Sequence, residues 1–348
     1  DDRLTQALIR ENLAQQNWQG VLSGIQLLDT EEQNSDRWQY WRARAQQALN
    51  TDTDDTKRIL QNLAQNRSWY GFLAADHINE NYQLADASHN ADKQLKLLLE
   101  QTPALARAKE LWIIGEHNQA RIEWHYALKT LSTTELVAAG ELAKDWGWYN
   151  SGITAMIRGN LWDHLSLRFP LAYKDTIEQA AINTQLDEAL IYAIARQESA
   201  FAEDVVSHAG ARGLMQLMPA TAKEQARHSG VKSHRTRDLF KPDHNIKLGS
   251  AYFSGLLEEF DGNRILATAA YNAGKHRVKR WLKVPQEPLT ADIWVEIIPF
   301  SETRQYVQNV LTYSVIYQYR LAEAKSSNTL QNSVKTRLLT EHEANIAL

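Results

Sequence analysis

The sequence predicts an all-α fold, and three observations support this. The 348 residues include only 15 glycines and 7 prolines, so long stretches lack residues that break helices. Apolar residues recur at intervals of three and four, the period of an amphipathic helix, whereas strands alternate every two. Hydrophobic residues make up 43% of the chain. At this length, that content predicts a folded protein with a large core, of about two domains.

Composition excludes several classes of chemistry. The chain has no Cys, which excludes thiol nucleophiles, disulfides and Cys-ligated metal sites. It also has no phosphate-binding glycine loop, no His-Glu-x-x-His motif and no calcium loop, so we expect no cofactor and no metal. The net charge of −4 predicts no nucleic-acid partner.

The membrane and targeting signals are weak. No stretch approaches the roughly 18 consecutive apolar residues of a membrane span, so the chain is not expected to be membrane-spanning. Residues 1–5 lack the basic and apolar segments of a signal peptide. The protein is therefore expected to be cytoplasmic or to have lost a leader by processing.

We predict a partial α-superhelical region over residues 1–80. Large aromatic residues and small alanines alternate in residues 38–45 and 69–75, which is typical of stacked helix hairpins. The tryptophans at 38, 69, 112 and 146 are unevenly spaced, so no strict tetratricopeptide period is present.

Four further segments follow. Polar residues within 81–103 predict a linker, and a second helical block spans residues 104–170, where Pro170 ends it. A third helical block spans residues 171–325. The tail, residues 326–348, has no clear apolar period and is expected to be peripheral or frayed.

Glu198 is the first candidate for catalysis. A capping-box-like start at 184–187 predicts a helix that runs to about Ser199. Helical spacing aligns Glu198 with Ile191, Ile194 and Phe201, and such apolar surroundings are expected to raise the pKa of its carboxyl. A protonated Glu is what a general acid at a glycosidic oxygen requires. The alternative is an ordinary surface Glu at a helix end.

Two neighbouring segments could complete a cleft. Residues 210–219 read as an apolar turn between helices, whose methionines and single Gln fit core packing as well as a site. A helix over 243–260 is followed by another that stops at 270–274, with Gly274 as its C′ residue. Tyr271 is then either a cleft residue or a buried tyrosine beside the helix end.

Residues 297–307 are expected to open another helix. Ser301 is the candidate N-cap, and Arg304 is expected to reach back to a carboxylate. Glu302 is either a second functional carboxylate or a first-turn Glu favoured by the helix dipole. The basic run 275–283 reads as a solvated helix face, or as a site for an acidic polymer.

Taken together, residues 198–201, 213–222, 270–274 and 298–307, in this order, resemble the signature set of the soluble lytic murein transglycosylases. The resemblance covers about residues 172–325 and implies a lysozyme-like α fold for that segment. Residues 68–75 and 104–168 resemble the end of the family's superhelical domain and its helical linker domain. Because that superhelical domain is usually longer, the chain is expected to be an N-terminally truncated form.

The resemblance implies cleavage of the β-1,4 bond between N-acetylmuramic acid and N-acetylglucosamine in peptidoglycan, leaving a 1,6-anhydromuramoyl end. Glu198 would act as acid and then as base, with the substrate's N-acetyl carbonyl as internal nucleophile. Five residues match positions that shape the family's cleft, and we expect them to bind substrate: Ser207, Gln216, Met218, Tyr271 and Glu302.

The same resemblance implies peptidoglycan glycan strands as the partner, cell-wall synthesis enzymes as further candidate partners, and a periplasmic location. Three alternatives stay open at this point. One is a lysozyme-type hydrolase that uses Glu203 or Asp204 as a second carboxylate. The second is a non-catalytic helical-repeat binding protein, and the third is a nucleic-acid binder that uses residues 275–283.

Overall fold

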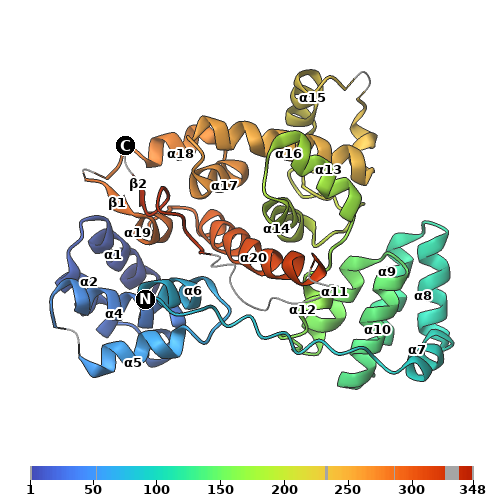
Figure 1. Ribbon diagram of the computed structural model, residues 1–348, viewed down its shortest axis with the longest axis horizontal. Helices are drawn as coiled ribbons and strands as arrows, with labels where there is room; N and C mark the ends of the chain where they lie inside the picture. The colour runs from blue at the N-terminus through green and yellow to red at the C-terminus, as the bar shows by residue number, and fades with distance from the viewer. Residues whose placement is uncertain (1, 52, 232–233, 286, 326–336, 347–348) are drawn as a thin grey trace. The chain divides into compact units, whose positions relative to one another are not determined.

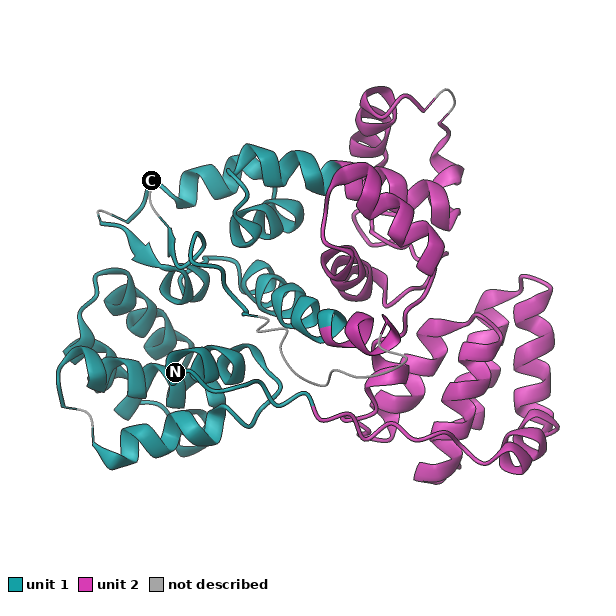
Figure 2. Cartoon of the chain, viewed as in Figure 1, with its two compact units in different colours: residues 1–84, 252–318, 328–348 teal, residues 85–251, 319–327 magenta. Residues whose placement is uncertain are grey.

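The computed structural model describes residues 2–51, 53–231, 234–285, 287–325 and 337–346. Within these ranges the chain forms 20 α-helices, one 3₁₀ helix and two short strands, so the predicted all-α class is confirmed (Figure 1). The chain divides into two compact units (Figure 2). Unit 1 comprises residues 1–84, 252–318 and 328–348, and unit 2 comprises residues 85–251 and 319–327.

The units combine segments that are distant in the sequence. Unit 1 joins the first 84 residues to part of the segment 171–325. Two long helices, α16 (Pro242–Glu259) and α20 (Ser301–Lys325), contribute residues to both units. The two compact units do not have the boundaries of the five predicted segments 1–80, 81–103, 104–170, 171–325 and 326–348. Those five segments therefore stay a prediction.

Unit 1 begins with six helices that pack largely in chain order. The tryptophan and phenylalanine side chains at 38, 41 and 72 are fully buried, and so are the alanines at 43, 45, 74 and 75. These helices are α1 (Asp2–Ala14), α2 (Trp18–Gln26), α3 (Thr30–Gln33), α4 (Asp36–Ala48), α5 (Asp54–Leu63) and α6 (Trp69–His77).

The remaining elements of unit 1 lie after residue 252. They are the end of α16, α17 (Arg264–Ala273), α18 (Lys275–Trp281), β1 (Leu289–Thr290), α19 (Ala291–Glu296), most of α20 and β2 (Asn345–Ile346). The two strands pair antiparallel, with Leu289 opposite Ile346.

Two buried carboxylates on α19 tie it to the N-terminal helices. Asp292 accepts hydrogen bonds from the Tyr40 hydroxyl (2.8 Å) and Arg44 Nε (3.1 Å). Glu296, which is 1% exposed, accepts hydrogen bonds from three residues: Arg37, Trp41 Nε1 (3.0 Å) and the Tyr70 hydroxyl (2.6 Å). A buried charge is tolerated only when it is paired and hydrogen-bonded, and both carboxylates meet this condition.

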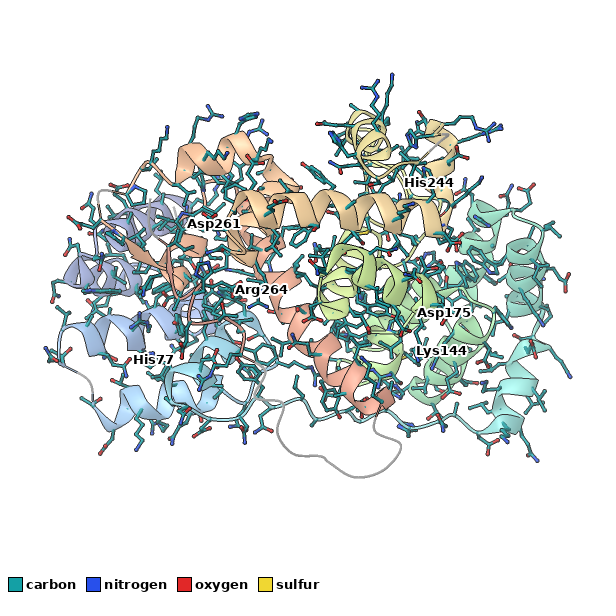
Figure 3. All side chains as sticks on the ribbon, turned by 45° about the horizontal axis from the view of Figure 1, so that its top comes forward. His77, Lys144, Asp175, His244, Asp261 and Arg264 are labelled. Carbon is teal, nitrogen blue, oxygen red and sulfur yellow. The ribbon has the colours of Figure 1, made fainter. Side chains whose placement is uncertain are left out.

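The C-terminal segment corrects a prediction. Residues 337–346 are docked, since Leu338 is 0% exposed and the buried Glu343 pairs at 2.6 Å with Arg264, at the start of α17. Figure 3 labels Arg264. Glu343 also accepts a hydrogen bond from the Arg264 backbone N–H (3.0 Å). The expectation of a frayed tail is wrong for these residues because an internal ion pair anchors them. Residues 326–336 and 347–348 lie outside the described ranges.

Unit 2 opens with an irregular segment and a helical block. Residues 85–92 form no helix, and α7 (Lys93–Glu100) lies inside the predicted linker 81–103. The ring of Trp148, which is buried, stacks on Trp112 and lies against Trp124 in the core of the block. The other helices of the block are α8 (Pro103–Ile113), α9 (His117–Ala127), α10 (Thr133–Asp145), α11 (Tyr149–Arg158) and α12 (Leu165–Arg168).

The second part of unit 2 carries Glu198. Here α13 (Lys174–Thr184) packs against α14 (Glu188–Ser199). These are followed by α15 (Pro219–His228), the 3₁₀ helix η1 (Thr236–Phe240) and the first part of α16.

Candidate active site

Glu198 lies in the last turn of α14. The helix starts at an N-cap, Asp187, whose carboxylate accepts the Ala189 N–H (2.9 Å). Thr184 is the last residue of α13, so the capping-box start was predicted three residues too early. Residues 189–195 are all buried, as are the predicted apolar neighbours, whereas Glu198 is half-buried. The helix therefore carries this carboxyl at the edge of a core.

The backbone turns sharply after Glu198. Ala200 (φ 47°) and Phe201 (φ 65°) are both left-handed, which costs a non-glycine residue roughly 1–2 kcal/mol. Ser199 stabilises this turn, since its hydroxyl oxygen accepts the Phe201 N–H (3.0 Å) and its proton is donated to the Leu214 carbonyl (2.8 Å). Strained backbone of this kind persists where the surroundings over-determine it, and it clusters at functional sites.

The segment 205–218 folds into a tight turn. Backbone bridges join Val206 to Arg212 and Arg212 to Leu217. Gly213 has φ 72°, and a Cβ there would lie 2.1 Å from the Leu239 carbonyl oxygen, so only glycine fits.

The side chain of Asn245, on α16, stabilises this turn through three hydrogen bonds. It is fully buried, accepts the Met215 N–H (2.7 Å) and donates to the Leu239 and Arg212 carbonyls (2.8 and 2.9 Å). Sequence reasoning missed Asn245, because nothing near it in the sequence indicates that its partners lie 6 to 33 residues away.

Three predicted substrate-binding residues belong to this turn. Ser207 is half-buried, and its hydroxyl oxygen accepts the Ala211 N–H (3.0 Å). Gln216 donates its amide nitrogen to the Gly213 carbonyl (2.9 Å) and the Val205 carbonyl (3.2 Å), which directs the amide oxygen to other donors. Met218 is 42% exposed.

The two methionines of the turn have different environments. Met215 is fully buried, and its Sδ lies 2.5 Å from where a Cβ at Gly249 would be. Met215 thus fills the core, while the exposed Met218 stays available to a ligand.

Glu203 and Asp204 are both paired. Glu203 accepts the Tyr173 hydroxyl at 2.5 Å, and Asp204 accepts hydrogen bonds from Arg121 and from His117 Nδ1 (3.2 Å). Burial opposes ionisation of Asp204, but hydrogen bonding to Arg121 offsets this, so the pKa of Asp204 lies below its ordinary value. Both carboxylates have structural partners, which weakens the case for either as a second catalytic group.

Tyr271 and Glu302 lie in unit 1. Tyr271, on α17, is half-buried and packs against the rings of Tyr252 and Phe253, with centroids 5.3 and 5.9 Å away. Gly274 ends α17 with φ 88°, as predicted. The next residue after Tyr271, Asn272, accepts the Thr303 hydroxyl (2.7 Å) and donates to Glu302 (3.5 Å).

The start of α20 departs from one prediction. Ser301 is the first helical residue, so it is not the N-cap. Arg304 donates to the backbone carbonyls of Ile298 (2.8 Å) and Glu296 (3.4 Å). The Glu296 carboxylate also attracts the Arg304 guanidinium electrostatically, so the expected contact of Arg304 with a carboxylate stays a prediction. Glu302 is exposed.

The basic run 275–283 begins with helix α18. Lys275 and Lys279 both pair with Glu259, at 2.9 and 2.6 Å, and these contacts lower the pKa of Glu259. Arg277 donates to the Ala273 carbonyl (2.8 Å). Three of the basic side chains in this run, Lys275, Arg277 and Lys279, therefore bind acceptors of the protein itself.

Two histidines of unit 2 lie close together. His234 and His244 stack, with Nδ1 and Nε2 2.9 Å apart, and His244 is labelled in Figure 3. No group of three or more His, Cys, Asp or Glu among the described residues could hold a metal ion. In the same residues, every helix is too short or too polar to cross a membrane.

The fold and the site fit one class of protein. A transglycosylase SLT domain model matches residues 175–293, a soluble lytic murein transglycosylase L domain model matches residues 98–165, and a soluble lytic transglycosylase helical domain model matches residues 297–326. The chain is therefore of the lytic transglycosylase class. It belongs to the soluble lytic murein transglycosylase family, as the sequence motifs predicted.

Individual relatives agree with this assignment. The soluble lytic murein transglycosylase of Escherichia coli K12 is 36% identical over 92% of this chain and 49% of its own length. An inactive Glu-to-Gln variant of lytic transglycosylase Slt from Pseudomonas aeruginosa has a TM-score of 0.88 at 39% identity, covering 100% of this chain and 55% of that one. A 70-kDa soluble lytic transglycosylase in complex with bulgecin A has a TM-score of 0.89 at 34% identity, covering 99% and 54%. The chain thus spans about half the length of these relatives.

Proposed function

We propose that this protein cleaves the β-1,4 bond between N-acetylmuramic acid and N-acetylglucosamine in peptidoglycan and leaves a 1,6-anhydromuramoyl end. The observation that carries the proposal is the position of Glu198, half-buried at the end of α14 beside a strained turn, within the segment matched by the SLT domain model. The inactive Pseudomonas aeruginosa relative, altered by a single Glu-to-Gln change, supports one essential glutamate in this family.

The chemistry needs one carboxyl group used twice. Glu198 donates its proton to the bridging oxygen as the bond from that oxygen to the muramoyl anomeric carbon breaks, while the N-acetyl carbonyl oxygen bonds to that carbon. The Glu198 carboxylate then takes the proton of the muramoyl 6-hydroxyl, whose oxygen attacks the same carbon and reopens the oxazolinium ring. Glu198 ends protonated, and no water is added.

The five remaining residues are assigned to substrate binding. The exposed Met218 packs on a sugar ring, and the Gln216 amide oxygen accepts from a sugar hydroxyl. Ser207 assists near the scissile sugar, and Tyr271 is assigned to substrate binding through its hydroxyl. Glu302 supplies an acidic group exposed at the start of α20. This mixture of apolar and polar groups suits a carbohydrate cleft.

The substrate sets the expected location and partners. Peptidoglycan lies outside the cytoplasmic membrane, so the proposal implies a periplasmic protein that binds glycan strands. The relative bound to bulgecin A supports binding of a small molecule by this fold. Cell-wall synthesis enzymes are proposed as further partners.

Mass spectrometry of muropeptides released from purified peptidoglycan tests the proposal. The expected products are lighter than hydrolytic ones by one water, and they are absent with Glu198→Gln. Reducing ends would show a lysozyme-type hydrolase instead. No release by the wild-type protein would leave a non-catalytic binding protein.

A further inference from the structure

The turn that follows Glu198 is held by side chains from a different part of unit 2, the helical block α8–α12. Asn150, in the first turn of α11, directs its amide nitrogen at the carbonyls of Ser199 (3.5 Å) and Ala200 (3.4 Å). The last carbonyls of a helix have no intrahelical partner. Asn150 therefore supplies donors where α14 ends, directly after Glu198.

Helix α9 holds the other end of the same turn. The two carboxylate oxygens of Asp204 are divided, with Oδ1 accepting from Arg121 and Oδ2 lying 3.2 Å from His117 Nδ1. The His117 ring lies on Trp112 with centroids 4.4 Å apart, and Trp112 stacks on the buried Trp148 at 4.8 Å. His117 therefore connects Asp204 to the stacked tryptophan rings in the core of the block.

A third contact lies on the other side of Glu198. Arg196, which is buried, donates its Nε to the Arg168 carbonyl (2.9 Å), and its guanidinium lies over the Phe169 ring at 5.5 Å. Both partners are at the end of α12. The block therefore contacts the chain before and after Glu198.

We propose that Arg121, His117 and Asn150 are positioning residues for Glu198, and that the helical block contributes to turnover through them. The inference rests on the function proposed above. The left-handed residues Ala200 and Phe201 are strained, so the turn keeps its geometry only while its neighbours enforce it. Loss of the Asp204 contacts lets the turn relax and moves the Glu198 carboxyl, whereas the substrate-binding turn 205–218 keeps its own backbone bridges.

The test compares two arginines of the same block. Arg121→Ala removes the contact to Asp204, and the matched control, Arg107→Ala, removes an exposed pair between α8 and α9, Arg107 to Glu123 at 2.8 Å. The kcat and KM for release of anhydromuropeptides are measured for both, below their thermal midpoints. We expect Arg121→Ala to lower kcat by about 10- to 100-fold with KM nearly unchanged, as a misplaced catalytic group does. Arg107→Ala should match the wild type.

Two further variants separate positioning from folding. Arg121→Lys keeps the charge and should restore part of the lost kcat. Added to Asp204→Asn, Arg121→Ala should lower kcat no further than Asp204→Asn alone, because the ion pair between the two residues is already lost. If Arg121→Ala proves too unstable to assay, Asn150→Ala gives the same comparison of kcat with KM.

The outcomes are distinguishable from those of the proposed function. A kcat for Arg121→Ala and Asn150→Ala equal to that of Arg107→Ala would overturn the inference while wild-type activity stands. A change confined to KM, or equal losses in Arg121→Ala and Arg107→Ala, would also overturn it. Failure of the wild-type protein to release anhydro products would overturn the proposed function itself.

Discussion

The carboxylates of α19 and the carboxyl of Glu198 show two uses of an acidic side chain. Asp292 and Glu296 are buried and accept hydrogen bonds from arginine, tyrosine and tryptophan donors of α4 and α6. Glu198 is half-buried and ends a helix beside a strained turn. A buried carboxylate surrounded by donors contributes to the stability of the fold. A half-buried carboxyl at the end of a helix is accessible enough to exchange a proton with a substrate. The comparison predicts that Glu198 controls rate and the α19 pair controls stability.

Replacement of Glu198 should produce the largest effect. Glu198→Gln keeps the size of the side chain but removes the transferable proton, so activity should fall by about 10²- to 10⁴-fold or more. The free energy of unfolding should stay within about 0.5 kcal/mol of the wild-type value. Muropeptide release and urea denaturation measure the two quantities. Unchanged product release would remove Glu198 from the mechanism.

Replacement of Glu296 should lower the free energy of unfolding, which replacement of Glu198 leaves nearly unchanged. Glu296→Ala leaves the guanidinium of Arg37 and the Tyr70 hydroxyl without their acceptor, and breaking a buried pair costs about 3–5 kcal/mol. Urea denaturation measures this, with Glu302→Ala as the control, since Glu302 is an exposed Glu of the same unit. Equal stabilities of the two variants would contradict a structural role for Glu296.

The turn 205–218 contains two glycines with left-handed backbone, Gly210 and Gly213, which can be compared. Gly213→Ala should destabilise the protein by more than about 2 kcal/mol, because left-handed backbone costs roughly 1–2 kcal/mol and the new Cβ also meets the Leu239 carbonyl. Gly210 has φ 91° but nothing within 4 Å of a Cβ, so Gly210→Ala should show only the backbone cost. Thermal denaturation of both variants checks this, and the same loss in each would show that close packing at Gly213 is unimportant.

Tyr271→Phe should change rate more than binding or stability. The ring keeps its packing on Tyr252 and Phe253, and only the hydroxyl is lost. Loss of one hydrogen bond is worth about 1 kcal/mol, so kcat should fall roughly 5- to 10-fold. Steady-state kinetics give kcat and KM separately. An undiminished kcat would exclude the hydroxyl from the mechanism.

The smallest effect concerns acid stability. Burial opposes ionisation of Asp292, but Arg44 and the hydroxyl donors offset it, and its pKa lies below the ordinary value. A lowered pKa means that the ionised form adds stability above the unfolded pKa of about 3.9, and that this contribution is lost as the pH falls further. Between pH 7 and pH 3, the wild type should therefore lose more stability than Asp292→Asn. Parallel loss in both proteins would contradict this.

Much of the fold and part of the site follow from local pattern. The helix that ends at Ser199, the helix stop at Gly274 and the exposed basic helix after it depend on capping, glycine and periodicity, which neighbouring residues supply. The start of the Glu198 helix and the cap of α20 were misplaced by one to three residues, because several polar residues there compete as caps.

Other features have no local signal. Glu203 and Asp204 are candidate second carboxylates by sequence, yet both are bound by side chains 30 to 87 residues earlier in the chain. Asn245 and the α19 carboxylates were missed for the same reason, since Glu296 meets donors up to 259 residues away. The docked segment 337–346 has no apolar period to indicate it.

The sequence by itself determined the helical class, the family and the candidate glutamate, because helix periodicity and ordered motifs are written in neighbouring residues. Only the tertiary structure decided which acidic groups are structural. Whether a carboxylate is paired depends on donors brought near by folding, and the stabilisation of a charge depends on its burial and its contacts. Folding brings an arginine into an ion pair with each of four carboxylates: Asp204, Asp292, Glu296 and Glu343.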